Sequence, residues 1–150
     1  ISTLISSDMS AYNKQIGGNH YQRFSMQPFE FFDKHKMPAG ESFAIKYLIR
    51  HPWKNGRQDL EKAFHCLDLI FDKHQEHGVS DWFGSTLTRN ECYTWANQLQ
   101  QEGVGARETY AITQLAEWLR TGDIHYLLMA QLEILDILEE TYPKPTITAT

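Results

Sequence analysis

Four basic side chains recur at short intervals in the first half of the chain: Lys46, Arg50, Lys54 and Arg57. The first two are four residues apart, so they share one face of a helix, and we expect both to point away from Phe43 and Tyr47. Arginine binds a phosphate through two parallel hydrogen bonds, whereas lysine acts as a point charge. The cluster predicts a site for a diphosphate or triphosphate; the alternative is a solvated basic face.

A short polar segment precedes this cluster. Gly17 and Gly18 are followed directly by Asn19, His20 and Tyr21. Glycine adopts backbone conformations in which neighbouring amides turn toward a phosphate, and an imidazole exchanges a proton near neutral pH. We therefore expect a loop that closes over the phosphates, with its histidine as a candidate catalytic group. The alternative is an ordinary turn that carries a surface histidine.

Carboxylates that could hold magnesium or orient a nucleophile lie in the same half. Glu30 and Asp59 are the candidates for handling a metal ion or a proton. Magnesium is usually held by one or two carboxylates together with substrate phosphates, so the spacing leaves the identity of the ligands open. A further set shares one helix face, for which the alternative is plain solvent exposure: Glu61, His65, Asp68 and Asp72.

The order of these motifs resembles a small phage domain of unknown function. This domain occurs across tailed-phage genomes and in the C-terminal part of the nucleotide kinase of T-seven-like phages. The sequence departs from the family where Ser42 and Phe43 replace a common Gly-Asn pair, and where Cys66 replaces a common tyrosine. The matching elements, within residues 16–77, are Gly17 to Tyr21, Gln27-Pro28 with Glu30, Lys46-Tyr47 with Arg50, Lys54-Asn55-Gly56, and Asp59-Leu60 with Lys62-Ala63.

The resemblance implies nucleotide chemistry. The family's described member phosphorylates deoxynucleoside monophosphates, so the implied reaction is phosphoryl transfer from a nucleoside triphosphate such as ATP, and magnesium is compatible with it. Catalysis would consist mainly of positioning and charge neutralisation. The residues thereby assigned to nucleotide binding are Gly17, Gly18, Asn19, Tyr21, Lys46, Arg50, Lys54 and Arg57, and the candidate catalytic residues are His20, Glu30 and Asp59.

Three other functions fit parts of the sequence. Phe43, at the family's usual asparagine, favours a non-enzymatic module that sequesters nucleotides or contacts a host protein. Trp82, Trp95 and Trp118 could serve a structural, self-assembling protein. A P-loop kinase is excluded because the sequence lacks a Gly-x-x-x-x-Gly-Lys-Ser/Thr loop. Four carboxylates near the C-terminus resemble those of all-α nucleoside triphosphate pyrophosphohydrolases, although the paired Glu-Glu-x-x-Glu element is missing: Glu133, Asp136, Glu139 and Glu140.

Hydrophobic periodicity predicts an all-α protein, a compact bundle of about six helices with irregular ends. Capping-box patterns at Asn55 with Gln58 and at Thr88 with Glu91 mark two helix starts, and Pro28 suits a first helical turn. We expect a single domain over residues 1–150, with a family-like segment at 16–77 and a helical extension at 86–141. The expected helices are 28–35, 41–51, 55–77, 88–103, 106–120 and 123–141, with a turn-rich connector at 78–85.

Each helix is expected to bury one apolar stripe. The last helix holds so many large apolar residues that we expect it to be central and buried on more than one side, and the protein to form a homo-oligomer. The expected buried sets are Phe43, Ala44, Tyr47 and Leu48 in the second helix, Leu60, Phe64, Leu67 and Phe71 in the third, Ile112, Leu115, Ala116 and Leu119 in the fifth, and Leu127, Leu128, Leu135 and Leu138 in the last.

Charge and composition narrow the partners and the compartment. The 150 residues carry a net charge of −5, and residues 76–150 hold only 4 Lys or Arg against 11 Asp or Glu. Polynucleotide binding needs a basic face, so we do not expect a nucleic-acid partner. Cys66 and Cys92 lack metal-type neighbours, and no apolar stretch is long enough to span a membrane, which favours a cytoplasmic protein. Met9 is a candidate start of translation.

Overall fold

The computed structural model describes residues 11–13, 15–16, 18–77 and 87–144, and this part of the chain is helical without strands. The all-α prediction is therefore confirmed. Met9, Gly17, Trp82 and the expected connector at 78–85 lie outside the described residues. The α-helices are α1 (Pro28–Lys34), α2 (Ala39–Arg50), α3 (Arg57–His77), α4 (Arg89–Gln101), α5 (Ala106–Thr121) and α6 (Ile124–Thr141), and the short 3-10 helices are η3 (Ala11–Asn13), η4 (His20–Arg23) and η5 (His51–Trp53).

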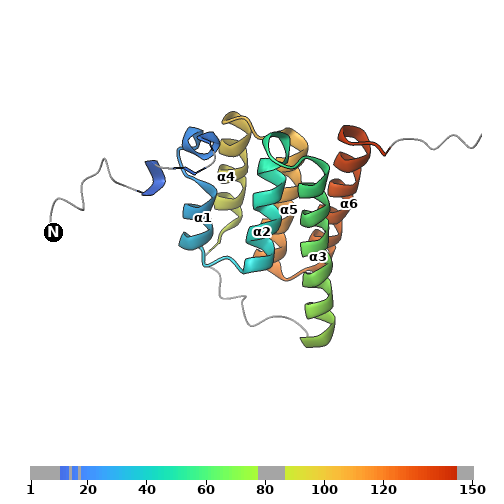
Figure 1. Cartoon of the computed structure of the whole chain (residues 1–150). Coiled ribbons are helices and arrows are strands. Elements are labelled where there is room, and N and C mark those ends of the chain that lie inside the picture. Colours follow the sequence, from blue (N-terminus) through green and yellow to red (C-terminus); the bar gives the residue numbers. More distant parts are fainter. Residues whose placement is uncertain (1–10, 14, 17, 78–86, 145–150) are drawn as a thin grey trace, which may run out of the picture.

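The six helices form two layers, with α1, α2 and α3 in front and α4, α5 and α6 behind them (Figure 1). One continuous hydrophobic core contains residues from both layers. The two halves of the described chain therefore cover each other. Three contacts between the layers illustrate the pairing of α1 with α4, α2 with α5 and α3 with α6: the Phe31 and Trp95 rings stack at 3.8 Å, Trp118 Nε1 donates to Glu41 at 3.2 Å, and Gln131 donates to Asp68 at 2.7 Å.

Local signals explain where several helices begin and end. The Thr88 hydroxyl accepts from the Glu91 amide at 3.1 Å and the Glu91 carboxylate accepts from the Thr88 amide at 3.3 Å, so this predicted capping box is confirmed. Asp123 caps α6 by accepting from the His125 amide at 2.9 Å. Gly122, at φ 73°, ends α5 in the left-handed conformation that glycine adopts without strain.

The buried stripe of α2 is turned by one residue from the expected one. Ala44 and Leu48 are fully buried, as predicted, but Phe43 is 49 % exposed and Tyr47 is only partly buried. Ile45 and Ile49 occupy the remaining inward positions. The prediction for Phe43 is wrong because α2 packs against both α3 and α5. These two helices cover the side of α2 that carries Ile45 and Ile49, and Phe43 lies on the other side.

Helix α6 is less enclosed than its composition indicates. It packs against α5 and α3, and Leu127, Ile134 and Leu138 are buried there. Leu128 and Leu135 are exposed, so the expectation that they are buried is wrong. The expected buried set of α5 is confirmed, because all four residues lie in the core.

Burial of the tryptophans tests the self-assembly interpretation. Trp95 and Trp118 are both buried inside the chain, so they do not form a surface for self-association. The structure also bears on membrane insertion: within the described residues, no helix reaches the length and hydropathy required to cross a bilayer.

Candidate functional site

Arg50 and Asp59 form an ion pair at the turn between α2 and α3. The guanidinium contacts both carboxylate oxygens, Nε to Oδ2 and Nη2 to Oδ1, each at 3.1 Å. Asp59 is fully buried, and its carboxylate also accepts from the backbone and side-chain amides of Asn55 at 3.3 and 3.4 Å. Asp59 thus takes the place at the start of α3 that the capping pattern assigned to Gln58.

The pKa of the Asp59 carboxyl reflects these contacts. Burial alone raises this pKa, but the hydrogen bonds from Arg50 and Asn55 outweigh burial and hold the pKa below its usual value. Asp59 is therefore a charged partner of Arg50, and both residues stabilise the turn in addition to any role in binding. From the sequence, pairing with a buried carboxylate such as Glu30 or Asp59 is the alternative to phosphate binding for Arg50, and the structure shows the pair with Asp59.

Lys46 turns toward aromatic rings on its own helix. Its ammonium lies 4.9 Å from the centre of the Phe43 ring and 4.7 Å from that of Tyr47, and the Arg50 guanidinium lies 4.9 Å from the Tyr47 ring. The expectation that both cations point away from these aromatics is therefore wrong. The electron-rich ring faces attract the cations. Burial lowers the pKa of the Lys46 ammonium, and the nearby Arg50 charge lowers it further.

The remaining two cations have different surroundings. Arg57 pairs with Glu61, Nε to Oε1 at 2.9 Å, and also donates to the backbone carbonyl of Tyr142. Lys54 is exposed at the end of η5. Two of the four expected phosphate ligands, Arg50 and Arg57, are thus already paired with carboxylates of the same chain.

The polar loop after Gly18 lies against this turn. Gly18 has φ 136°, a conformation that favours glycine. His20 stacks on Trp53 of η5 at 4.9 Å, and the Tyr21 ring meets Trp53 edge-on at 5.9 Å. Burial raises the pKa of the Tyr21 phenol; the Arg50 charge lowers this pKa and the Asp59 charge raises it, and the net shift is upward. Asn19 is exposed just before η4. The structure thus brings the predicted loop to the predicted cationic turn.

The candidate metal carboxylates are dispersed. Glu30 accepts from the Gln27 amide at 3.3 Å in the capping box of α1, far along the chain from Asp59. Among the described residues, no three His, Cys, Asp or Glu side chains gather as metal ligands would. Three carboxylates of α6 instead gather around one arginine: Arg107 contacts Glu133 at 2.9 Å, Asp136 at 3.7 Å and also Glu140, and Glu139 is exposed.

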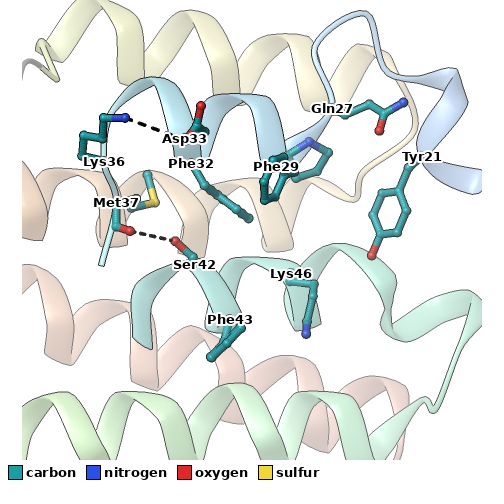
Figure 2. A pocket seen from close by; sticks show the side chains of 11 residues that line it. Tyr21, Gln27, Phe29, Phe32, Asp33, Lys36, Met37, Ser42, Phe43 and Lys46 are labelled. Carbon is teal, nitrogen blue, oxygen red and sulfur yellow. Dashed lines mark hydrogen bonds and ion pairs between the residues drawn. The ribbon is translucent and has the colours of Figure 1, made fainter. Parts of the chain in front are cut away.

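A pocket of about 590 Å3 opens between α1 and α2, beside Tyr21 (Figure 2). Aromatic rings project from α1 toward α2, and the Tyr21 hydroxyl points toward α2 on the side where Lys46 lies. Of the expected site residues that the structure describes, only Tyr21 and Lys46 line it. The pocket is otherwise mainly apolar, and its lining is Tyr21, Gln27, Pro28, Phe29, Phe32, Asp33, Lys36, Met37, Ser42, Phe43 and Lys46.

The sequence interpretation missed the aromatic wall. The closely spaced Phe29, Phe31 and Phe32 predict a short, strongly apolar helix, but among the three only Phe31 is buried, in its stack on Trp95. Phe29 is 66 % exposed. The available signal was the adjacency of the phenylalanines, since a helix as short as α1 cannot bury all of its sides against one neighbour.

A second polar network was also missed. His51 is buried and contacts Glu108 Oε1 through Nε2 at 3.0 Å and the Tyr142 hydroxyl through Nδ1 at 2.8 Å. Burial raises the pKa of Glu108, but the His51 contact outweighs it and leaves the pKa below the usual value. This network ties the residue after α6 to the turn between α2 and α3. The sequence alone assigns Tyr142 to the irregular C-terminal end.

Comparison with known proteins identifies no relative of this chain. No protein-family profile matches the chain, and neither a curated protein nor a solved structure shows significant similarity to it.

Proposed function

We propose that the protein binds a nucleotide in the pocket between α1 and α2 and that it does so without turning the nucleotide over. The observation that supports this proposal is the combination, in one pocket, of exposed aromatic rings with a lysine and a phenol. The volume of about 590 Å3 lies within the range of small-molecule sites. The same features favour the sequestering or host-interaction alternative, in the cytoplasm of a phage-infected cell, over a kinase.

The aromatic wall supplies the contact for a nucleobase. Phe29 and Phe43 come from facing helices and expose their rings at the pocket. Bases stack on such rings regardless of their hydrogen-bonding edges, and each stacked base contributes about 1–3 kcal/mol. Phe43 stands where the resembled family commonly has asparagine, so this chain has an additional ring at this position.

Lys46 supplies the contact for the phosphate. Lys46 lines the pocket, and its ammonium lies over the Phe43 and Tyr47 rings. The Tyr21 hydroxyl, whose pKa is raised by burial, stays protonated and can donate a hydrogen bond to an anion. Lys36 also lines the pocket, but its ammonium lies 3.8 Å from the Asp33 carboxylate. The Lys46 ammonium and the Tyr21 hydroxyl together suit a monophosphate better than a triphosphate.

Ion pairs within the chain favour binding without catalysis, because they neutralise two of the four candidate phosphate ligands. Phosphoryl transfer needs several charged groups positioned around the transferred phosphate. Arg50 is neutralised by Asp59 and Arg57 by Glu61. Phosphoryl transfer from ATP remains the alternative from the family resemblance, and the following experiment separates the two functions.

Isothermal titration with each deoxynucleoside monophosphate and with ATP tests the proposal. We expect a monophosphate to bind, and Lys46→Met to weaken its binding about tenfold or more, since a hydrogen bond to a charged group contributes about 1.5–3 kcal/mol. Methionine retains the apolar stem of the side chain. Lys34→Met is the matched comparison, because Lys34 lies on α1 outside the pocket and is exposed.

Each outcome of this experiment decides between the functions. If Lys46→Met retains wild-type affinity for every nucleotide, the pocket assignment is wrong. Incubation with labelled ATP and each monophosphate, with and without magnesium, is the accompanying assay. Formation of a labelled diphosphate would show that the protein is a kinase and overturn the non-enzymatic proposal.

A further inference from the structure

An exposed row of leucines crosses the two helices at one end of the bundle. Leu128, Leu132 and Leu135 lie at i, i+4 and i+7 on α6 and are 44 %, 56 % and 39 % exposed, while Leu69 of α3 is 55 % exposed. Helices α3 and α6 run next to each other there (Figure 1). We call these four residues the leucine face. A contiguous apolar surface of this kind on a soluble domain marks an interaction site.

The leucine face borders a hollow. An open depression of about 610 Å3 lies between α3 and α6, with Leu69 on one wall and Leu128 on the other. Its floor includes the Gln131 side chain, which donates to Asp68 at 2.7 Å and holds the two helices together. The face thus offers a groove that can receive apolar side chains from a partner.

Acidic residues lie at the borders of the groove. Asp68 and Asp72 line the hollow itself, together with His65. The lysines of α3, Lys62 and Lys73, lie near Tyr47 and Glu41 of α2. Four carboxylates and no lysine or arginine lie on α6, within residues 124–141. Glu133, Asp136 and Glu140 contact Arg107. Asp136 is nevertheless exposed beside the leucine row, and so is Glu139. An apolar groove with negative borders is complementary to an apolar stripe with positive borders.

We propose that the leucine face binds an amphipathic helix whose apolar stripe is flanked by lysine or arginine. Helix-in-groove recognition uses apolar anchors at i, i+3, i+4 and i+7, the same spacing that Leu128, Leu132 and Leu135 present. The partner helix lies along α3 and α6 and places its cations beside Asp68, Asp72 and Glu139. This site is separate from the pocket between α1 and α2, so it does not depend on nucleotide binding.

Charge also distinguishes this occupant from a second copy of the chain. Pairing two leucine faces would bring the carboxylates of two α3–α6 edges together, and like charges that face each other across an interface are destabilising. The homo-oligomer expected from the apolar content of α6 is therefore an alternative outcome of the test rather than the occupant we infer.

The test uses two labelled synthetic peptides of about 16 residues, long enough for four helical turns. Both carry leucine at i, i+3, i+4 and i+7; one has lysine at the flanking positions and the other glutamate. Fluorescence anisotropy with the full chain is expected to show binding of the lysine peptide, at least tenfold tighter than the glutamate peptide. Added salt should reduce this difference by screening.

Variants of the protein locate the binding surface. Leu132→Ser should weaken binding of the lysine peptide at least tenfold. Asp72→Asn should weaken binding of the lysine peptide and should not weaken binding of the glutamate peptide, because it removes a like charge from the groove. Both side chains are exposed, so the fold is expected to survive. Tyr93→Ser provides a matched comparison, because Tyr93 is an exposed aromatic residue on α4, away from the groove.

Four results would overturn the inference. One is failure of the lysine peptide to bind at millimolar concentration. The second is equal binding of the two peptides, and the third is binding that Leu132→Ser leaves unchanged. The fourth is a dimer in light scattering that Leu132→Ser dissociates, which would identify a second copy as the occupant of the leucine face.

Discussion

At the scale of single residues, charge neutralisation within the chain decides what each ionisable group can do. The Arg50 guanidinium contacts both oxygens of the fully buried Asp59 carboxylate. A buried charge without its partner is costly, because the interior solvates it poorly. Lys46, by contrast, has aromatic rings as its neighbours. The two cations of one helix face therefore differ: one supports the fold and the other is available to a ligand.

Removal of the Arg50 guanidinium should destabilise the fold. We expect Arg50→Ala to lower the free energy of unfolding by about 3 kcal/mol, because the buried Asp59 carboxylate loses its partner. Arg50→Lys should cost less, since it keeps the charge and loses only the two-pronged contact. Urea denaturation followed by circular dichroism measures both. Arg89→Ala, at an exposed arginine on α4, should be nearly neutral, and an equally neutral Arg50→Ala would refute this account.

Acid should weaken the protein partly through Asp59. The folded-state pKa of this carboxyl lies below its ordinary value of 3.8, so in acid the unfolded chain takes up the proton first. Stability from this group is thus present above the ordinary pKa and is lost as pH falls toward the folded-state pKa. Asp59→Asn should therefore be less stable at neutral pH and show a shallower loss of stability in acid.

Urea midpoints measured across the acid range test this dependence. Asp72→Asn serves for comparison, since Asp72 lies on the same helix and is exposed. It should retain the wild-type slope of stability against pH. An unchanged slope in Asp59→Asn would mean that other carboxyl groups account for the acid sensitivity.

At the scale of elements, short polar contacts set the helix boundaries and link neighbouring helices. The Thr88 and Glu91 capping box starts α4, and Glu91 also lies 3.4 Å from Nε2 of the buried His35 at the end of α1. The Glu91 carboxylate therefore caps the start of α4 through Oε1 and contacts the end of α1 through Oε2. Tyr142 acts similarly at the end of α6 through its contacts with His51 and Arg57.

The Thr88 cap should contribute measurably to stability. Thr88→Ala removes the acceptor of the Glu91 amide, and we expect it to cost about 1 kcal/mol, the usual effect of losing an N-cap. Thr88→Ser should retain most of the stability. Thr94→Ala, at an exposed position inside the same helix, should be neutral or slightly stabilising, because alanine is the better helix former. Equal urea midpoints for the two alanine variants would contradict the capping role.

At the scale of the whole molecule, the protein is two layers of helices that share one core. The N-terminal half forms the front layer and the C-terminal half the back layer, so each half buries the apolar face of the other. The pocket lies between α1 and α2, whereas the leucine face lies on α3 and α6. The bundle thus presents two separate surfaces.

The stack of Phe31 on Trp95 should be a main link between the layers at the α1 end. We expect Phe31→Ala to cost about 3 kcal/mol or more, the scale of a buried aromatic truncation. Phe29→Ala, two residues away and exposed, should change stability by about 0.5 kcal/mol or less. In a double-mutant cycle with leucine at both positions, Phe31 and Trp95 should couple by about 1 kcal/mol. Additive effects would show that the stack contributes no more than separate burial.

The sequence by itself determined the class of fold and most helix boundaries. Those signals are local: apolar residues at helical spacing predicted α5 and its buried set, and Thr88 with Glu91 predicted the start of α4. The sequence also selected the residues that meet at the turn after α2, because Arg50 and Asp59 are only nine residues apart. Local spacing, however, carries no information about which charges neutralise each other.

Only the tertiary structure decided which faces are covered and which remain open. Phe43 and Leu128 satisfy the same helical periodicity as buried neighbours, yet both are exposed because no described helix packs over them. Whether a residue on a helix is core or surface depends on the direction from which the next helix approaches. That direction is set by pairing α1 with α4, α2 with α5 and α3 with α6, and these contacts join residues up to 77 positions apart.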